Sequence, residues 1–462
     1  MRKITPHPEW SQDDVLAVAM TWPADQPMAV LHSGGSTGPW TRWSMIAPPR
    51  GHLQVNADGC QWRGPRWPAL EEALANIDTS DPLAVIDAAV AADRMDTLEA
   101  DCRLPFMGGW LVSLRYELGS QIEPATQPDD NREPGPLADL LWCPDALVHD
   151  GQADQWWQVG SVSKDASPEH VGTPLRMEDW ISRPDQAGFE AAVQKTIELI
   201  RRGDLFQANI ARQLTTTCHG DLRGFALDAL ASSGAWFGCW LELPGASTDR
   251  AVLSLSPELF LDLDGDSNHL RTRPIKGTRS AGDEVSDLVQ SDKDAAELNM
   301  IVDLMRNDLG RVCTIGSIQV SQTRMVESHP TVHHGVAEVS GSLQPGRTVG
   351  DILRATFPPG SVTGAPKIRA MQVINELEGQ ERGAYCGAVG CLSTNGDLRL
   401  GVSIRTAAFQ GTARHGFRDV TGTLQYGTGC GIVVDSDPAD EYHESEVKAE
   451  ALRRLSRRPV TS

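Results

Sequence analysis

Residues 426–432 are Tyr-Gly-Thr-Gly-Cys-Gly-Ile, so glycine occupies every second position. Alternate glycines in an extended segment leave one side of the backbone without side chains, which lets a ligand or another segment come close. The exposed N–H groups suit a carboxylate or phosphate, and the same pattern suits a close crossing of two strands. The segment lacks the spacing and lysine of a phosphate-binding loop, and we expect it to precede a strand. A dinucleotide-binding fold is therefore not expected.

The composition is that of a globular chain with a strong negative charge. Its 462 residues carry a formal net charge of −21, with 40% apolar and 22% charged residues. This length allows two or three ordinary domains or one large domain. Nucleic acids and anionic membrane surfaces are not expected as partners, because both require clustered Lys and Arg. An anionic substrate would need a local cluster of cations or a metal ion.

The sequence also favours a cytoplasmic protein with free thiols. No apolar stretch follows the first residues, so we expect no secretory signal, and no segment approaches the ~20 apolar residues of a membrane span. The nine cysteines are scattered, and the closest pair, Cys386 and Cys391, has neither metal-binding nor redox spacing.

We expect two regions along the chain. Residues 1–160 alternate short apolar strands with turns and include a Pro-rich polar loop at 123–136, and a second polar passage at 161–184 leads to residues 186–458. Apolar periodicity in the second region predicts a helix from Phe189 that ends near Gly203, a strand over 207–214, a strand pair over 251–263, and helices over 286–309, over 366–377 and from 438.

One lysine stands in an unusual place. Residues 273–278 are Arg-Pro-Ile-Lys-Gly-Thr, which predicts that Lys276 lies in a tight, glycine-ended turn after a strand. A desolvated amine near other cations loses its proton more readily. A lysine in such a turn can therefore act as a nucleophile rather than as a solvated charge.

Two acidic pairs suggest a metal site. Asp294 and Glu297 lie three residues apart in one expected helix, and Glu441 and Glu444 lie three apart in another. Residues three apart share a helix face. If the two faces met, their carboxylates would suit Mg²⁺. The alternative is two solvated acidic faces, which the spacing alone favours in a chain this acidic.

Three further features are compatible with an anion site. Residues 360–367 lead into a helix N-terminus, which offers free N–H groups to an anion, although an ordinary capped helix is the commoner case. Arg405 lies in an expected strand and would need an anionic partner if it pointed inward. Glu258 suits either a general acid or the ion-pair partner of a nearby lysine.

Taken in this order, these segments resemble those of the chorismate-utilising enzymes, which include anthranilate synthase component I, aminodeoxychorismate synthase component I, and the isochorismate and salicylate synthases. The resemblance covers nearly the whole chain and is densest in the segments GDLFQANIARQL, SPELF, RPIKGT, ELNMIVDLMRNDLG, GSVTGAPKIRAM, GVSIRT and GTGCGIVVDS. It implies an α+β fold: a large sandwich of two antiparallel sheets with helices packed outside. It also implies that residues 186–458 form a chorismate-binding catalytic domain.

The resemblance implies roles for the matched residues. Lys276 and Glu258 would be catalytic. The Mg²⁺ ligands would be Glu297 and Glu444, with Asp294 and Glu441 in the adjoining acidic positions. The residues implied to bind chorismate are Tyr385, Arg405, Gly429, Gly431, His334, Ser361, Thr363, Gly277, Thr278 and Lys448.

Two positions separate the members of this family. The isochorismate and salicylate synthases resemble one another in a lysine that activates water, where this chain has Gln207, so water addition is not expected. Anthranilate synthases have a small residue where Lys276 stands, whereas RPIKGT resembles the aminodeoxychorismate synthases. The resemblance then implies that Lys276 attacks C2 of chorismate, that Glu258 protonates the leaving C4 hydroxyl, and that ammonia attacks C4 and expels the lysine.

The resemblance also has implications for partners. The sequence shows no glutaminase nucleophile elbow, so a separate glutamine amidotransferase subunit would supply the ammonia. It shows no lyase region, so pyruvate elimination to 4-aminobenzoate, on the path to folate, would belong to another enzyme. The rival functions are anthranilate synthase component I and a catalytically silent binding or regulatory subunit.

Some N-terminal halves in this family bind tryptophan. The matching positions here are Ser33, Trp40, Thr41, Arg42, Trp43, Trp236, Phe237 and Gly238. Aromatic residues that pack in the core are the expected alternative.

Overall fold

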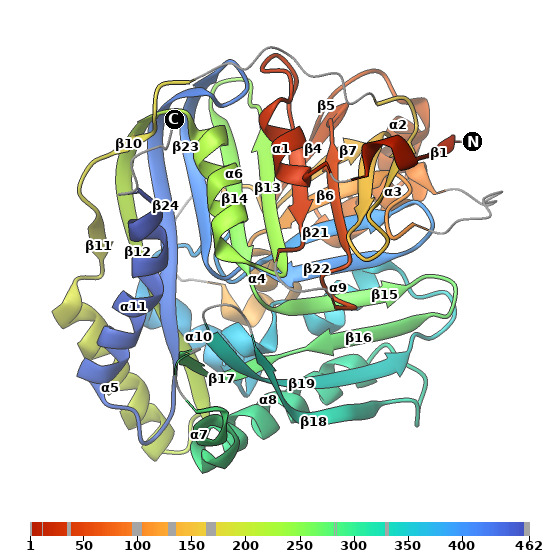
Figure 1. The fold of residues 1–462 in the computed structure, drawn as a ribbon. Coiled ribbons are helices and arrows are strands. Elements are labelled where there is room, and N and C mark those ends of the chain that lie inside the picture. The colour runs from red at the N-terminus through yellow and green to blue at the C-terminus, as the bar shows by residue number, and fades with distance from the viewer. Residues whose placement is uncertain are drawn as a thin grey trace.

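The computed structural model describes residues 2–11, 13–34, 38–94, 104–127, 135–162, 172–280, 282, 284–328 and 332–456. Within these residues the strands form two sheets, of thirteen and eleven strands, whose neighbours run antiparallel. Figure 1 shows the long strands of the first sheet upright, with several strands of the second sheet lying across them. This arrangement confirms the predicted sandwich of antiparallel sheets.

The first sheet has the order β1 (Ile4–His7), β9 (Gln155–Val159), β8 (Ala146–Asp150), β3 (Trp43–Ala47), β2 (Ala29–His32), β13 (Phe237–Leu243), β14 (Asp249–Ser256), β23 (Thr406–Arg414), β24 (Asp419–Ile432), β12 (Gln207–Gly220) and β10 (Arg176–Met177). Two short strands, β11 (Ile181–Arg183) and β20 (Gly364–Ala365), also pair with β12.

The second sheet has the order β17 (Ile275–Ser280), β19 (Val332–Ser342), β16 (His269–Arg273), β15 (Leu259–Asp264), β22 (Leu398–Val402), β21 (Ala388–Ser393), β6 (Gly109–Leu114), β7 (Ala138–Cys143), β4 (Gly51–Asn56) and β5 (Gly59–Arg63). Strand β18 (Gln319–Ser328) pairs with β19.

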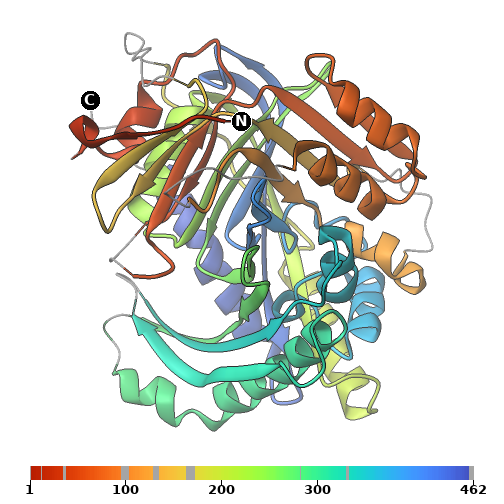
Figure 2. The same ribbon diagram turned by 90° about the vertical axis from the view of Figure 1, so that its right-hand side faces the viewer.

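Helices cover the outer faces of the sheets. Those packed on the first sheet or on each other beside it are α1 (Val15–Met20), α5 (Gln186–Arg201), α6 (Leu222–Ser233), α10 (Lys367–Glu378) and α11 (Pro438–Ser456). The others are α2 (Pro68–Ala75), α3 (Pro82–Asp93), α4 (Leu118–Ile122), α7 (Val285–Gln290), α8 (Asp292–Gly310) and α9 (Val349–Thr356). Figure 2 shows α7 and α8 beneath β18 and β19, which they contact. Among the described residues, no helix combines the length and the apolar character that a membrane crossing requires.

The period of two in each strand divides its side chains between two cores. In β13, Cys239 and Leu241 face the layer between the sheets, where they meet Leu111 of β6, while Trp240 points to the outer helices. This alternation is what two packed sheets require, because successive side chains leave a strand on opposite faces.

Both sheets contain strands from both regions of the chain. Strand β2 pairs with β13, and β6 pairs with β21. Residues 1–160 and residues 186–458 therefore share the same two sheets, and the division into two domains stays a prediction.

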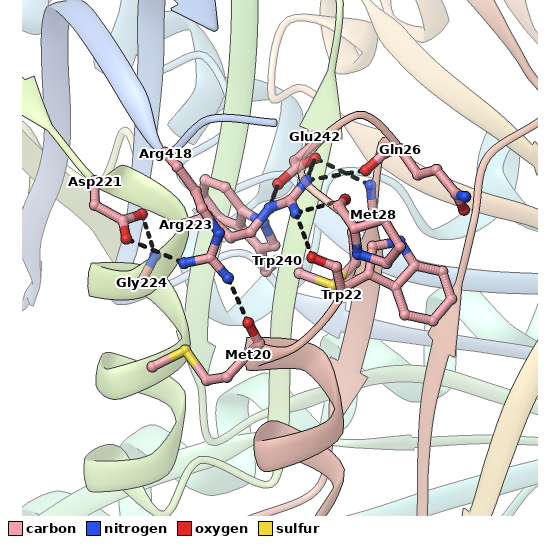
Figure 3. A network of polar contacts seen from close by, with 11 residues as sticks. Met20, Trp22, Gln26, Met28, Asp221, Arg223, Gly224, Trp240, Glu242 and Arg418 are labelled. Carbon is pink, nitrogen blue, oxygen red and sulfur yellow. Dashed lines mark hydrogen bonds and ion pairs between the residues drawn. The ribbon is translucent and has the colours of Figure 1, made fainter. Parts of the chain in front are cut away.

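A buried ion pair ties the two regions together (Figure 3). Arg223 of α6 and Glu242 of β13 are both 0% exposed, and their Nε and Oε1 atoms are 2.6 Å apart. Arg223 also donates to the carbonyl of Gln26, and Glu242 accepts the N–H of Met28 at 3.0 Å. The pair thus satisfies backbone groups of the segment that leads into β2.

One predicted helix is divided. The sequence predicted a helix over residues 286–309, but the structure has α7 and α8 with a break at Ser291. The Ser291 hydroxyl accepts the N–H of Asp294 and so begins a new helix as its N-cap. The predicted apolar stripe on α8, which includes Leu298 and Met305, is buried.

Candidate active site

Lys276 lies in a bulged strand, which corrects the predicted turn. In the pairing of β17 with β19, Ile275 opposes Val336 and Thr278 opposes His334, so β17 has one extra residue. Gly277 adopts φ +81, and a Cβ there would lie 2.9 Å from Cγ of Asp294. A glycine is therefore required for the bulge and for the close approach of α8.

The Lys276 amine lies against the glycine strip. A Cβ at Gly431 would lie 3.0 Å from Nζ of Lys276 and 2.3 Å from Nε2 of Gln207. The strip forms the end of β24 rather than a loop before a strand, which corrects the sequence expectation. The sheets therefore bring Lys276 of β17, Gln207 of β12 and Gly431 of β24 to one place.

Glu258 belongs to the same site. It is 4% exposed and lies in the short connection between β14 and β15. Burial raises the pKa of its carboxyl to about 7, although a hydrogen bond from Ser361, the charge of Lys276 and the N–H of Ile275 oppose this shift. A carboxyl group with such a pKa can hold a proton near neutral pH and give it to a leaving group.

The other glycines of the strip make room for neighbours. A Cβ at Gly427 would lie 2.1 Å from Cγ of Tyr385, so the tyrosine ring packs directly on this glycine. A Cβ at Gly429 would lie 2.4 Å from the carbonyl oxygen of Ile210. Strand β23 pairs with β24 only up to Tyr426, so the strip beyond that residue borders the site.

Arg405 is the clearest anion-binding group. It lies between β22 and β23 with φ +51, and not within a strand as predicted. Burial lowers the pKa of its guanidinium, while Tyr426 opposes that shift. Among the described residues, no carboxylate forms an ion pair with Arg405. An anion that reaches this guanidinium would compensate a costly buried charge.

His334 and the 360–367 segment also border the site. His334 is 2% exposed, and its Nδ1 lies 2.9 Å from the hydroxyl of the exposed Thr278. Ser361 faces Glu258, but the Thr363 hydroxyl donates within its own turn to the carbonyls of Pro359 and Gly360. The Thr363 hydroxyl thus holds the loop in shape, and its contact with a ligand stays a prediction.

Glu441 and Glu444 come together as the sequence predicted. Ligand atoms of Cys430, Glu441 and Glu444 all lie within 4.8 Å of one another. Glu441 is 7% exposed and accepts a hydrogen bond from the Ser436 hydroxyl at 2.7 Å. The two carboxylates suit a hard cation such as Mg²⁺, whereas the thiol does not.

The two residues of the first acidic pair, Asp294 and Glu297, have different surroundings. Asp294 forms an ion pair with Arg279 at 2.7 Å, and Glu297 is half-buried on α8. Lys448 pairs with Glu444 at 2.7 Å, and its Nζ donates to the carbonyl of Gly429 at 2.9 Å. Lys448 therefore connects the acidic face of α11 with the glycine strip.

The candidate tryptophan positions lie just after β2, at the start of β3 and at the start of β13. The Trp40 indole is 8% exposed, and the guanidinium carbons of Arg271 and Arg273 lie 4.9 and 4.8 Å from its ring centre. The Ser33 hydroxyl donates to the Trp43 carbonyl. The Trp40 side chain thus occupies space against the second sheet. Binding of free tryptophan stays a prediction. The other residues of this set are Thr41, which is buried, Arg42, which pairs with Asp150, Trp236, which precedes β13, and Phe237 and Gly238 at its start.

Asn209 was not singled out from the sequence. It is 8% exposed, pairs with Gly431 across the strands, and shares one face of β12 with Gln207. The signal that could have identified it is its spacing of two residues from Gln207, because such residues share a strand face.

Comparisons with known proteins agree with this geometry. The chain is 34% identical to "Aminodeoxychorismate synthase component 1" of Escherichia coli (strain K12) over 90% of each chain, and 34% identical to the protein of the same name from Salmonella typhimurium, also over 90% of each. The crystal structure of anthranilate synthase component I from Streptococcus pneumoniae TIGR4 matches with a TM-score of 0.73 and 27% identity, over 90% of this chain and 93% of that one. The family model for chorismate binding enzymes matches residues 44–454, and the chain belongs to that family.

Proposed function

We propose that this protein converts chorismate and ammonia into 4-amino-4-deoxychorismate. The observation that supports this most strongly is the position of Lys276 beside Glu258, whose carboxyl has a pKa of about 7. An amine and a protonated acid in one site are the nucleophile and the general acid that this reaction needs. The name of the two 34% identical relatives agrees with this choice.

The reaction would proceed through a covalent intermediate. The Nζ of Lys276 attacks C2 of chorismate, the two conjugated ring double bonds shift, and the C4–O bond breaks. Glu258 gives its proton to the departing hydroxyl, which leaves as water, and its carboxylate then takes up the proton that the bonded Lys276 nitrogen loses. Ammonia then attacks C4, the C2–Nζ bond breaks, and the leaving lysine amine takes up the proton that the incoming nitrogen loses.

The substrate carboxylates would be bound at two ends of the site. Arg405, with Tyr385 and the backbone around Gly429 and Gly431, would bind the enolpyruvyl carboxylate. His334 would lie beside the ring. This assignment gives the guanidinium the anionic partner that the described residues do not supply.

Mg²⁺ fits the carboxylates at the other end. Glu441, Glu444 and Glu297 would hold the ion, which would neutralise the ring carboxylate of chorismate inside an acidic protein. In the structure Glu444 is paired with Lys448, so the ion would replace the lysine as partner of that carboxylate.

A separate amidotransferase would supply the ammonia. The two relatives are called component 1, which supports a second component for this chain as well. A cytoplasmic location stays a prediction from the sequence.

The product identifies the reaction. The protein is incubated with chorismate, Mg²⁺ and an ammonium salt, and the products are separated by chromatography and identified by mass. We expect 4-amino-4-deoxychorismate, which yields 4-aminobenzoate only after a lyase is added. Fluorescent anthranilate without a lyase would contradict the proposal and favour anthranilate synthase. No turnover at all would favour the silent subunit.

A further inference from the structure

A polar cavity of about 520 Å³ opens at one end of the sandwich. This volume is within the range of cavities that hold a small molecule. Strands β12, β14, β23 and β24 of the first sheet line it, together with β4 and β5 of the second sheet. None of the roles assigned above involves this cavity.

The cavity lies where the apolar layer between the sheets ends. Val252 of β14 and Ala408 of β23 belong to that layer. Two residues away on the same strand faces are Arg250 and Gln410, which oppose each other across the strands. Gln425 of β24 opposes Ala408 and so faces the same way. Long polar side chains at positions that face the other sheet depart from the pattern of a sandwich, and such departures are expected at functional sites.

The cavity is separate from the candidate active site and from the candidate tryptophan positions. Gln425 precedes Gly431 on β24 by six residues, so about 20 Å of extended strand lies between the cavity and the Lys276 amine. The turn after β13, residues 245–248, also lines the cavity, whereas the tryptophan position Phe237 lies at the other end of β13.

Two guanidinium groups in the cavity converge on one neutral oxygen. Oε1 of Gln54 lies 3.3 Å from both Nη1 and Nη2 of Arg63, and 3.4 Å from Nη2 of Arg250. These hydrogen bonds are long, because guanidinium groups bind carboxylate oxygens at about 2.7–2.9 Å and about twice as strongly as neutral pairs do. An anionic oxygen at this point would therefore be a better acceptor than the amide.

Arg63 is the guanidinium that lacks a counter-charge. Arg250 binds Asp139 at 2.7 and 2.6 Å, and Arg115 pairs with Glu381 at 2.9 Å. Among the described residues, no carboxylate forms an ion pair with Arg63, and its buried Nε has no acceptor. Within that part of the chain the cavity thus has one uncompensated positive charge, in a protein whose formal net charge is −21.

We propose that this cavity binds a small hydroxylated carboxylate. The carboxylate would bind Arg63 in place of the Gln54 amide and compensate its charge. The hydroxyl groups would pair with the side-chain amides of Gln213, Gln410 and Gln425, because hydroxyls and amides both donate and accept hydrogen bonds. Gln410 and Gln425 are exposed, so a ligand can enter from solvent.

Other classes of ligand match the cavity less well. Among the described lining residues only Pro136 and Ala246 carry apolar side chains, so an aromatic ring would gain few contacts. A phosphate monoester carries a charge of about −1.5 to −2, which exceeds the one uncompensated guanidinium. An ammonium group would need a carboxylate, and the lining carboxylate, Glu381, is already paired with Arg115.

Calorimetric titration with gluconate tests the proposal, and sorbitol is its neutral counterpart. Both titrations use the full-length protein at constant pH and constant ionic strength. We expect the wild type to bind gluconate saturably and to bind no sorbitol, because sorbitol has the hydroxyl groups without the carboxylate. Gluconate that binds no better than sorbitol would overturn the proposal.

Variants of Arg63 locate the binding. Arg63→Gln should weaken gluconate binding by about tenfold or more, as the loss of a hydrogen bond to a charged group implies. Arg63→Lys keeps the charge without the planar fork, so it should bind gluconate more tightly than Arg63→Gln does. Arg66→Gln is the matched control, because the Arg66 side chain is 83% exposed and lies outside the cavity, and gluconate binding should stay the same. Urea denaturation confirms that the three variants remain folded.

Two further results would overturn the proposal. Equal binding of gluconate by the wild type and Arg63→Gln would place the anion elsewhere, for example at Arg405. Inorganic phosphate that binds the wild type more tightly than gluconate, and that Arg63→Gln fails to bind, would show a phosphate site instead. None of these measurements depends on the reaction at Lys276.

Discussion

Glu258 makes the stability of the protein depend on pH in a direction that can be measured. Burial raises the pKa of this carboxyl from its ordinary value of 4.5 to about 7. The folded protein therefore binds the proton more tightly than the unfolded chain does. The contribution of Glu258 to stability is therefore largest below the pKa that this carboxyl has in the unfolded chain. The free energy of unfolding falls as the pH rises from there towards the pKa of Glu258 in the folded protein. A shift of this size corresponds to about 3 kcal/mol, at 1.36 kcal/mol per pKa unit.

Glu258→Gln isolates that contribution, because glutamine has a similar size and does not ionise. The free energy of unfolding is measured by urea denaturation of both proteins between about pH 4 and pH 8. We expect the wild type to lose about 3 kcal/mol relative to Glu258→Gln over this range. The offset caused by changed hydrogen bonds is constant with pH and does not affect the comparison.

The same substitution has a catalytic consequence. Glutamine cannot donate the proton to the leaving hydroxyl, so adduct formation should slow by about 10²- to 10⁴-fold. Stability curves of the two proteins that run parallel across the whole pH range would refute the reasoning, because they would show that Glu258 ionises as an ordinary carboxyl.

Three other predictions follow from the geometry. Gly431→Ala places a methyl group 3.0 Å from Nζ of Lys276, so adduct formation measured by mass should slow by about tenfold or more, and an unchanged rate would contradict this placement of the amine. Glu242→Ala leaves Arg223 as an unpaired buried charge, so urea denaturation should show a loss of about 3–5 kcal/mol, and a loss under about 1 kcal/mol would show that the pair is not buried in solution. Chelation of divalent cations should abolish turnover and Mg²⁺ should restore it, and Glu444→Gln should raise the Mg²⁺ concentration needed by about tenfold or more, whereas an unchanged requirement would remove Glu444 from the metal site.

Much of the fold follows from local pattern. The apolar stripe of α8 predicted a buried helix face, and Gly379 ends α10 with φ +62, as a glycine after a helix predicts. The break at Ser291 was missed because the apolar stripe begins only after it. The N-cap that divides α7 from α8 lies in a segment without a strong periodic signal.

The site depends on long-range pairing that local pattern does not contain. Glu258 and Lys276 are connected through the second sheet, because strand β15 follows Glu258, strand β16 pairs with β15, and β16 leads into β17. No spacing rule predicts that a carboxyl before one strand will face an amine two strands later. The family resemblance supplied this pairing, and the structure adds its electrostatic consequence at Glu258.

The acidic pairs show a second limit of spacing arguments. Residues three apart share a helix face, but the partner of each carboxylate is set by tertiary contacts. Asp294 lies close to Gly277, with its Cγ 2.9 Å from the position of a Cβ there, and is paired with Arg279, whereas Glu441 and Glu444 lie beside Cys430. Equal spacing thus leads to two different environments.

The covalent intermediate is the central claim, and intact-mass spectrometry tests it most directly. The protein is mixed with chorismate and Mg²⁺ in the absence of ammonia, and Lys276→Ala is treated in the same way. We expect the wild type to gain the mass of chorismate minus one water, located by peptide mapping on residues 273–278, and the variant to gain nothing. An unmodified wild type that nevertheless forms 4-amino-4-deoxychorismate when ammonia is added would contradict the role of Lys276 as nucleophile.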